Sequence, residues 1–562
     1  MPYSSNSGKF FCDRAVMRIT SQLSHALFES HRILDVGAGS GTYSDRYGKT
    51  YLDRVKFKWT GVEIWEPYVA KFGLESKYDT LIVGDAIEHL ITESKRRSSY
   101  DVCFMGDVVE HVSKEAAIKM VELALKCCNA IILSIPIIHY PQEAYDGNPY
   151  EKHVKDDWSH QEVMETFGNV VVEYGVENEI GVYVLSTRKT NLLKDVLRPQ
   201  VACYSICKNE EHFIERFYES IQDADFIAIV DTGSTDSTFD KLVSFVYHRT
   251  EQHGHEEEFK CDVGADLQGG IHSIRIATDG AMQVMRAWIH PWRFDDARNI
   301  ALCSLPEDPD VCISIDIDEL LEPGWKEVIC AAVLDDLHRQ GKPADRYNHR
   351  FSTIWNWQNP EQAPNFTDHW HERIHSRKGY FWKLPVHEIL VKDGPEQMRW
   401  LQDLKMIQKP DLSKSRSSYL TLLERSLKEE PNRWKLWSFY ASDLQGVNRF
   451  DDALLALNKA KTLPDADKAF LSFQCSNIYK HLGNHSKAIA EMLIATTEST
   501  SREYRVWLAR LYRDLNKPRE ALNSILMAAE VTERTQGYSY DPTCWGQQFD
   551  DLVEQLTAEC KL

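Results

Sequence analysis

The residues best suited to chemistry in the first third of the chain are carboxylates and glycines that follow short apolar runs. The run RILDV carries Asp35, and the segment behind it supplies Gly37, Gly39 and Gly41. Glycines are needed where a strand turns sharply into a helix and the backbone must approach a ligand. This arrangement predicts a cradle for a nucleotide-type cofactor.

Three later apolar runs in the same third also end in acidic residues. Glu63 could accept hydrogen bonds from both hydroxyls of a ribose, and Asp85 from an adenine amino group. Asp107 ends the last of these runs, and His111 or His153 could act as general base on an acceptor hydroxyl, because histidine titrates near neutral pH. A structural hydrogen-bonding role is the alternative for either histidine.

Together, DVGAGSG, the acidic residue of the second run and the sequence D-V-V-E-H resemble the class I S-adenosylmethionine-dependent methyltransferases over most of residues 10–190. The resemblance implies S-adenosylmethionine (SAM) as cofactor. The residues implied to hold it are Asp35, Gly37, Gly39, Gly41, Glu63, Asp85 and Asp107. An NAD-dependent dehydrogenase is the alternative, but the third glycine of its G-x-G-x-x-G motif is replaced by Thr42.

A second set of polar residues begins near residue 199. Asn209 and Glu210 follow the apolar run VACYSIC, and Asp231 ends the run FIAIV before a turn rich in glycine, serine and threonine. An acidic residue at such a strand end, beside a helix N-terminus, suits a nucleoside with its phosphates.

In SIDIDE, alternation along a strand would put Asp316 and Asp318 on one face. Two neighbouring carboxylates predict a bound Mg²⁺ or Mn²⁺ that bridges a diphosphate, since hard cations prefer oxygen ligands. A solvated edge strand is the alternative, and the flanking valine and isoleucines count against it.

The order of K-N-E-E, V-D-T-G-S-T-D, D-D-A-R-N and D-I-D-E resembles family 2 glycosyltransferases of GT-A fold across about residues 199–400. The resemblance implies a nucleoside-diphosphate sugar as donor, bound by Asn209, Glu210, Asp231, Arg298 and Asp316. It implies that Asp316 and Asp318 hold the metal, with His387 as a third ligand. Glu388 and Glu319 are both candidates for the base.

The last part of the chain repeats. Ala453, Ala488 and Ala521 stand in similar frames 35 and 33 residues apart, close to the 34-residue period of helix–turn–helix arrays. Roughly residues 417–530 resemble tetratricopeptide repeats, and an ordinary helical bundle is the alternative. A family 2 glycosyltransferase followed by such repeats resembles the bacterial peptide S-glycosyltransferases. That resemblance implies a homodimer through the helical tail. Those enzymes lack an N-terminal methyltransferase, so the acceptor stays open as a protein, peptide or glycan.

Composition limits the class of protein. The 562 residues carry a formal net charge of −20, which disfavours bulk binding to nucleic acid. The 13 cysteines, adjacent Cys127 and Cys128 among them, do not read as a disulfide framework, and no apolar run reaches the 18 residues of a membrane span. These features predict a cytoplasmic protein of a bacterium or of a virus-infected host cell.

The sequence therefore predicts three units. Residues 1–195 are expected to form a Rossmann-like α/β methyltransferase, residues 196–408 an α/β GT-A glycosyltransferase, and residues 409–562 an all-α tetratricopeptide-like domain, with a linker near 190–199. The predicted function is bifunctional: metal-dependent inverting transfer of a sugar, and SAM-dependent O-methylation of the glycan. The alternatives are glycosylation of modified bases in viral DNA, and a scaffold with degenerate catalytic domains.

Overall fold

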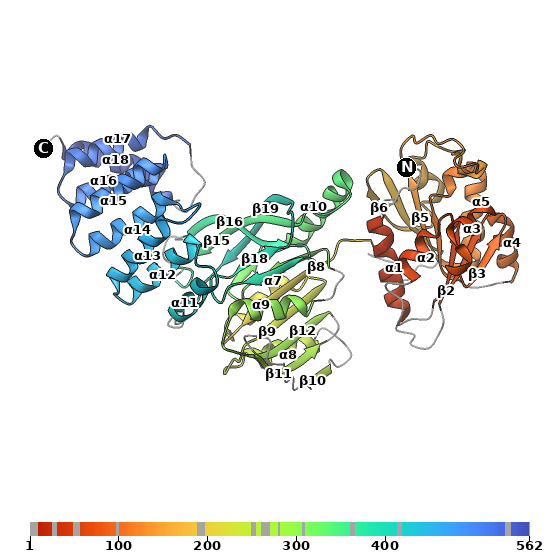
Figure 1. Ribbon diagram of the computed structural model, residues 1–562, viewed down its shortest axis with the longest axis horizontal. Coiled ribbons are helices and arrows are strands. Elements are labelled where there is room, and N and C mark those ends of the chain that lie inside the picture. Colours follow the sequence, from red (N-terminus) through yellow and green to blue (C-terminus); the bar gives the residue numbers. More distant parts are fainter. Residues whose placement is uncertain are drawn as a thin grey trace.

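The computed structural model describes residues 9–24, 31–48, 57–96, 100–187, 197–248, 255–259, 270–278, 281–305, 309–359, 366–412, 419–533 and 541–560. Figure 1 shows three units in a row, with the N-terminal α/β unit at one end and the helical C-terminal unit at the other. Most of the predicted linker near residues 190–199 lies outside the described residues.

The N-terminal unit is a seven-stranded sheet with the order β3-β2-β1-β4-β5-β7-β6. Its strands are β1 (His31–Val36), β2 (Phe57–Glu63), β3 (Thr80–Val83), β4 (Tyr100–Gly106), β5 (Cys128–Pro136), β6 (Val171–Glu177) and β7 (Ile180–Leu185). Its helices are α1 (Lys9–Ser24), α2 (Thr42–Gly48), α3 (Pro67–Phe72), α4 (Ala86–Arg96), α5 (Lys114–Cys127) and α6 (His160–Phe167). Strands β1 to β5 are parallel, whereas β7 is antiparallel to its neighbours β5 and β6.

Both faces of this sheet are covered, which explains why the central strands β4 and β5 are buried along almost their whole length. Ile33 and Phe104 belong to one buried cluster, whereas Leu34 and Met105 belong to the cluster on the other face. The strand order reverses between β1 and β4, and ligands bind at such switch points in open α/β sheets. The expected doubly wound α/β arrangement is therefore present.

The middle unit is built on a ten-stranded sheet with the order β10-β11-β12-β9-β8-β13-β16-β15-β19-β14. Its strands are β8 (Val201–Cys207), β9 (Phe226–Asp231), β10 (His255–Phe259), β11 (Gly270–Thr278), β12 (Met282–His290), β13 (Val311–Ser314), β14 (Glu319–Leu321), β15 (Arg346–Ile354), β16 (Phe366–His375) and β19 (Met398–Gln408). Its helices are α7 (Ile214–Ile221), α8 (Thr238–His248), α9 (Phe294–Cys303) and α10 (Trp325–Gln340), and a separate hairpin pairs β17 (Tyr380–Lys383) with β18 (Ile389–Lys392).

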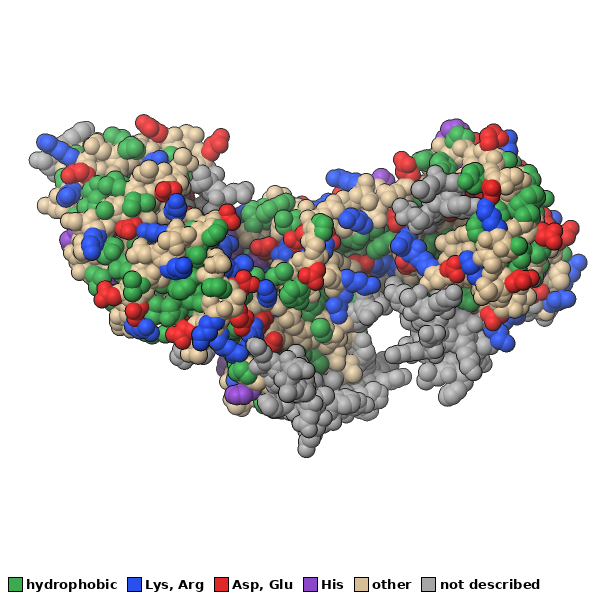
Figure 2. Space-filling model, viewed as in Figure 1, with side chains coloured by type: hydrophobic (Ala, Val, Ile, Leu, Met, Phe, Trp, Pro, Cys, Tyr) green, Lys and Arg blue, Asp and Glu red, His purple; other side chains and the backbone are tan. Residues whose placement is uncertain are grey.

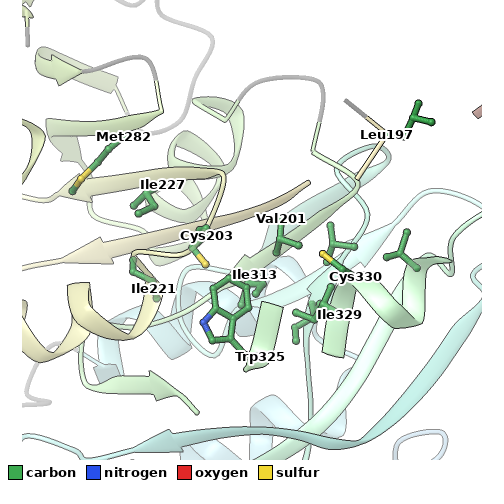
Figure 3. Packing of buried hydrophobic residues seen from close by; sticks show 14 of the residues in the cluster. Leu197, Val201, Cys203, Ile221, Ile227, Met282, Ile313, Trp325, Ile329 and Cys330 are labelled. Carbon is green, nitrogen blue, oxygen red and sulfur yellow. The ribbon is translucent and has the colours of Figure 1, made fainter. Parts of the chain in front are cut away.

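Strands β12, β9, β8 and β13 of this sheet are parallel. Figure 3 shows how their apolar side chains pack against α7 and α10, with Val201, Cys203 and Ile313 near Trp325 and Ile329. One expectation is wrong here. Strand β13 ends at Ser314, so the two aspartates of SIDIDE do not lie on one face of a strand; they lie in the turn between β13 and β14.

The C-terminal unit consists of antiparallel helices. They are α11 (Tyr419–Glu429), α12 (Trp434–Gly446), α13 (Phe450–Lys461), α14 (Lys468–His481), α15 (His485–Glu498), α16 (Arg502–Asp514), α17 (Pro518–Ala529) and α18 (Gln547–Glu559). Helices α12 and α13, α14 and α15, and α16 and α17 pack as consecutive pairs. Ala453, Ala488 and Ala521 are each 0% exposed, as expected where small side chains let two helices approach closely.

Ion pairs join the three units. Arg14 on α1 forms an ion pair with Asp310 and donates a hydrogen bond to the carbonyl of Arg198. At the other end of the middle unit, Arg293 pairs with Glu429 on α11. Among the described residues, no helix combines the length and apolarity needed to cross a membrane.

Candidate functional site

The first candidate site lies at the carboxyl edge of the N-terminal sheet. Asp35 is on β1 near its carboxyl end, Glu63 is the last residue of β2, and Asp85 and Asp107 follow β3 and β4. Because these strands are parallel, their carboxyl ends share one edge. The structure thus brings the predicted acidic residues to one edge of the sheet, with Asp35 and Asp107 at the ends of the two strands that flank the switch point and Asp85 after the outermost strand.

The glycine loop after β1 fits closely against its surroundings. Gly37 has φ +72°, and a Cβ there would lie 2.5 Å from Val108 Cγ2. Gly41 has φ +76°, and a Cβ there would lie 2.6 Å from Lys77 Cδ. Both positions have the left-handed conformation that favours glycine, and a side chain at Gly37 would clash with Val108. Glycines in this conformation let the chain turn tightly after β1, as a phosphate- or nucleoside-binding loop requires.

Asp35 is buried at 1% exposure beneath this loop. Its Oδ2 accepts a 2.5 Å hydrogen bond from the Tyr78 hydroxyl, while Oδ1 has no hydrogen-bond partner among the described residues. Burial raises the pKa of Asp35 to about 7, with Glu63 adding to the rise and the Tyr78 hydrogen bond opposing it. An unpartnered buried acceptor suits a ligand that brings a donor or a positive charge.

The other two nucleoside-binding candidates also hold the backbone around the site. Glu63 accepts from the Gly39 amide at 2.7 Å and from the Trp65 amide at 2.8 Å, which ties the ends of β1 and β2 together. Asp85 is exposed, and its Oδ1 accepts from the amides at the start of α4, including that of Ile87 at 2.7 Å.

A cluster of potential metal ligands lies just past the end of β4. One ligand atom each of Glu110, His111 and His153 lies within 4.8 Å of the others. The two imidazole rings meet edge to face at 4.7 Å. His153 Nδ1 lies 2.5 Å from the Tyr140 carbonyl oxygen, and His111 Nδ1 lies 3.3 Å from the Lys152 carbonyl oxygen. The structure therefore places the two predicted histidines side by side, although they are far apart in the sequence.

Glu110 lies in this cluster, although sequence reasoning assigned it no role. It is 3% exposed, and its Oε2 has no hydrogen-bond partner among the described residues. Burial and the neighbouring Asp107 raise the pKa of Glu110 well above its ordinary value. Burial and His153 lower the pKa of His111 to about 4, so this imidazole is neutral at pH 7. The only sequence signal was its place beside His111 in D-V-V-E-H.

The segment between β5 and α6 folds over this cluster. Glu151 accepts a 2.9 Å hydrogen bond from the Tyr68 hydroxyl, so the segment also contacts α3. Tyr140 and Tyr150 are each 48% exposed on it, and the Tyr150 ring lies 6.2 Å from that of Trp65. Aromatic surface thus borders the carboxylates and histidines.

The second candidate site lies at the carboxyl edge of the middle sheet. Asp231 is fully buried at the end of β9, and its Oδ1 accepts from the amides of Gly233 and Ser234 and from Arg286 Nε, at 3.0, 3.0 and 2.9 Å. Asn209, which has φ +54°, accepts from the Thr235 amide at 2.8 Å. These side chains hold the turn that follows β9.

Glu210 is buried beside the same turn. Its backbone amide donates to Thr238 Oγ1 at 2.7 Å, which ties the segment after β8 to the start of α8. The residues predicted to bind a nucleotide near β8 and β9 are therefore adjacent in space.

A charge network surrounds Asp316. Arg298 donates to Asp316 at 2.8 Å and to Glu388 at 2.6 Å, and Arg373 donates to both Asp316 and Glu319 at 2.9 Å. Burial alone would raise the pKa of Asp316, but the two guanidinium groups bring it below its usual range. Sequence reasoning did not single out Arg373.

The other two predicted metal ligands, Asp318 and His387, contact other residues and do not gather with Asp316. Asp318 Oδ2 accepts from Gln408 Nε2 at 3.2 Å. The His387 ring stacks on Phe439 of α12, with centroids 3.9 Å apart. In the described part of the chain, Asp316, Asp318 and His387 do not form a set with ligand atoms within 4.8 Å of one another.

Comparisons with known proteins add little. No family model and no curated protein matches the chain. YrrB, a TPR protein with an unusual peptide-binding site, is 21% identical over 20% of this chain, with a TM-score of 0.18, and the chain spans only 57% of that protein's length. MamA is 13% identical over 26% of this chain and 88% of its own, with a TM-score of 0.20. The N-terminal domain of EvdMO1 with SAH bound is 14% identical over 31% of this chain and 79% of its own, with a TM-score of 0.23. Scores this low carry no argument about function.

Proposed function

We propose that the N-terminal unit transfers a methyl group from SAM to an acceptor hydroxyl. The observation that carries this proposal is the gathering of Asp35, Glu63 and Asp107 near the switch point of a doubly wound sheet, beside a loop whose three glycines all have positive φ. The unpartnered Oδ1 of Asp35 fits a cationic cofactor, and Glu63 would accept from its ribose.

The acceptor hydroxyl would meet the Glu110, His111 and His153 cluster. A neutral imidazole can accept its proton as the methyl group is transferred. The same three side chains could hold a divalent cation, which would supply positive charge beside the acceptor oxygen. Exposed aromatic rings on the covering segment, those of Tyr140 and Tyr150, offer faces for an acceptor ring.

Calorimetric titration of the full chain with SAM tests the first proposal. Wild type should bind one equivalent. Glu63→Gln should weaken binding by about 10- to 150-fold, because hydrogen bonds to a charged acceptor contribute about 1.5–3 kcal/mol. Glu75→Gln, an exposed carboxylate of the same unit, is the matched control and should bind like wild type. Absence of SAM binding by the wild-type chain would refute the proposal.

A second activity, glycosyl transfer from a nucleoside-diphosphate sugar, is favoured by the middle unit. The observation is the buried network of Asp316, Glu319 and Glu388 with Arg298 and Arg373 beside the carboxyl edge of the sheet. Guanidinium groups in that position suit a departing diphosphate. A divalent cation held by Asp316 and Asp318 would neutralise further charge. Of the two candidate bases, Glu388 would deprotonate the acceptor, because Glu319 is fully buried and accepts hydrogen bonds from Arg373 and the Asp316 amide. The methyltransferase would then modify the transferred glycan.

A donor screen tests this second activity. Release of nucleoside diphosphate is measured with Mn²⁺ present for wild type, Asp318→Asn and the exposed control Asp403→Asn. One donor should be consumed by wild type and by the control but not by Asp318→Asn. Equal turnover in all three proteins would show that Asp318 takes no part in the reaction, and release of nucleoside diphosphate from none of the donors would contradict glycosyl transfer.

A further inference from the structure

Trp288 is a large aromatic side chain left exposed at the carboxyl edge of the middle sheet. It lies on β12, two residues beyond Arg286, and is 44% exposed. Strand β12 runs parallel to β9, and the register sets Arg286 level with Asp231. Trp288 therefore stands just past the level at which β9 ends.

The indole lies against the turn that follows β9. An ideal Cβ at Gly233 would be 3.6 Å from Trp288 Nε1 and 3.8 Å from its Cδ1. Gly233 has φ +98°, a conformation that other residues rarely adopt. The glycine thus lets this turn pass beside the indole without a side chain between them.

The strand that carries Trp288 is anchored on the same side. The Arg286 guanidinium lies 4.1 Å from the ring centroid of Phe239 on α8, and its Nε donates to Asp231 at 2.9 Å. Asp231 in turn accepts from the turn amides of Gly233 and Ser234. Hydrogen bonds and a cation–π contact therefore tie the strand that carries Trp288 to the turn and to α8.

Trp288 differs from other exposed aromatic side chains in its place, because it lies beside the turn after β9 at the carboxyl edge, where ligands bind in open α/β sheets. Every nucleobase has a flat face that stacks on an aromatic side chain. Phosphates of the same ligand would then extend toward the Arg298 and Arg373 guanidinium groups farther along the carboxyl edge.

We propose that Trp288 forms the stacking wall for the nucleobase of the sugar-nucleotide donor. This inference rests on the proposed glycosyl transfer. It assigns contact with the base to the indole on β12, whereas Asp231 accepts two hydrogen bonds from the turn and one from Arg286. Stacking is tolerant of base identity, so Trp288 would set affinity more than the choice between bases.

The test titrates the full chain with uridine, guanosine, adenosine and thymidine diphosphates in the presence of Mn²⁺, followed by calorimetry. Trp288→Leu should weaken binding by about 5- to 150-fold, the range that removal of one base-stacking aromatic side chain produces. Trp288→Phe keeps an aromatic face and should therefore bind nearly as tightly as wild type. Trp400→Leu is the matched control, because Trp400 is 51% exposed on β19, away from the turn after β9, and should leave affinity unchanged.

The outcomes separate the two proposals. If a diphosphate binds wild type and Trp288→Leu equally, the stacking wall is refuted while glycosyl transfer stands. If no diphosphate binds wild type, the proposed glycosyl transfer is refuted, and so is the proposed role of Trp288, which rests on it. If Trp288→Phe binds as poorly as Trp288→Leu, an aromatic face is not what the site uses, and the inference is likewise overturned.

Discussion

Replacing Asp35 by asparagine is expected to flatten the pH dependence of stability in the N-terminal unit. Burial raises the pKa of Asp35 from an ordinary 3.8 to about 7. Between these values the folded chain binds a proton at Asp35 that the unfolded chain has lost. The stabilising contribution of the protonated group is therefore fully present below pH 3.8 and is lost as the pH rises to about 7.

The expected magnitude follows from the two pKa values. The difference between 3.8 and about 7 corresponds to about 4 kcal/mol at 1.36 kcal/mol per pKa unit. Asparagine has nearly the same shape and can still accept from the Tyr78 hydroxyl, but it carries no charge. Asp35→Asn should thus match wild type near pH 4 and exceed it in local stability by up to about 4 kcal/mol above pH 7.

Hydrogen exchange followed by mass spectrometry isolates this unit from the rest of the chain. Opening free energies are compared at pH 5 and pH 8 for peptides covering β1 and β4, after correction for the chemical exchange rate. Wild type should lose protection between the two pH values, whereas Asp35→Asn should not. Glu75→Gln is the control and should behave like wild type. Equal pH dependence in wild type and Asp35→Asn would refute the reasoning.

Two further substitutions probe packing and charge elsewhere. Arg298→Met should destabilise the middle unit by about 3–5 kcal/mol in denaturant unfolding, because Asp316 and Glu388 lose their shared buried partner; an unchanged midpoint would contradict the described network. Ala488→Leu should lower the stability of the helical unit by about 1–3 kcal/mol through overpacking between α14 and α15, seen as an earlier thermal transition in circular dichroism, while exposed Ala490→Leu should leave it unchanged.

The sequence predicted the site best where the position of a residue at the end of a strand is enough to place it. Asp35, Glu63 and Asp85 follow apolar runs, and parallel strands bring their carboxyl ends to one edge whatever the details of packing. The repeat spacing likewise identified Ala453 and Ala488 as close-packing positions, since a helical period places small residues between paired helices.

Features that depend on distant segments could not be predicted. His153 meets Glu110 only because the segment between β5 and α6 folds back over β4. Arg373 contacts Asp316 from β16, the strand that pairs with β13, and no local sequence pattern predicts that contact. The turn at Asp316 replaced an expected strand because the Glu319 amide donates back to the Asp316 carbonyl at 2.9 Å.

Charge is distributed over the surface in keeping with the composition. Figure 2 shows basic and acidic side chains interspersed over the face in view. The net charge of −20 therefore reflects a mixed surface on which acidic groups outnumber basic ones, an arrangement that disfavours bulk binding to phosphates.

Photo-crosslinking with methyl-labelled SAM tests the central claim most directly. The full chain is irradiated with the labelled cofactor, with or without excess S-adenosylhomocysteine, and the labelled peptides are mapped. The label should appear in peptides spanning residues 35–65 or 100–111 and should disappear with the competitor. Label that resists competition, or that maps to the middle or helical unit, would contradict a SAM site at the carboxyl edge of the first sheet.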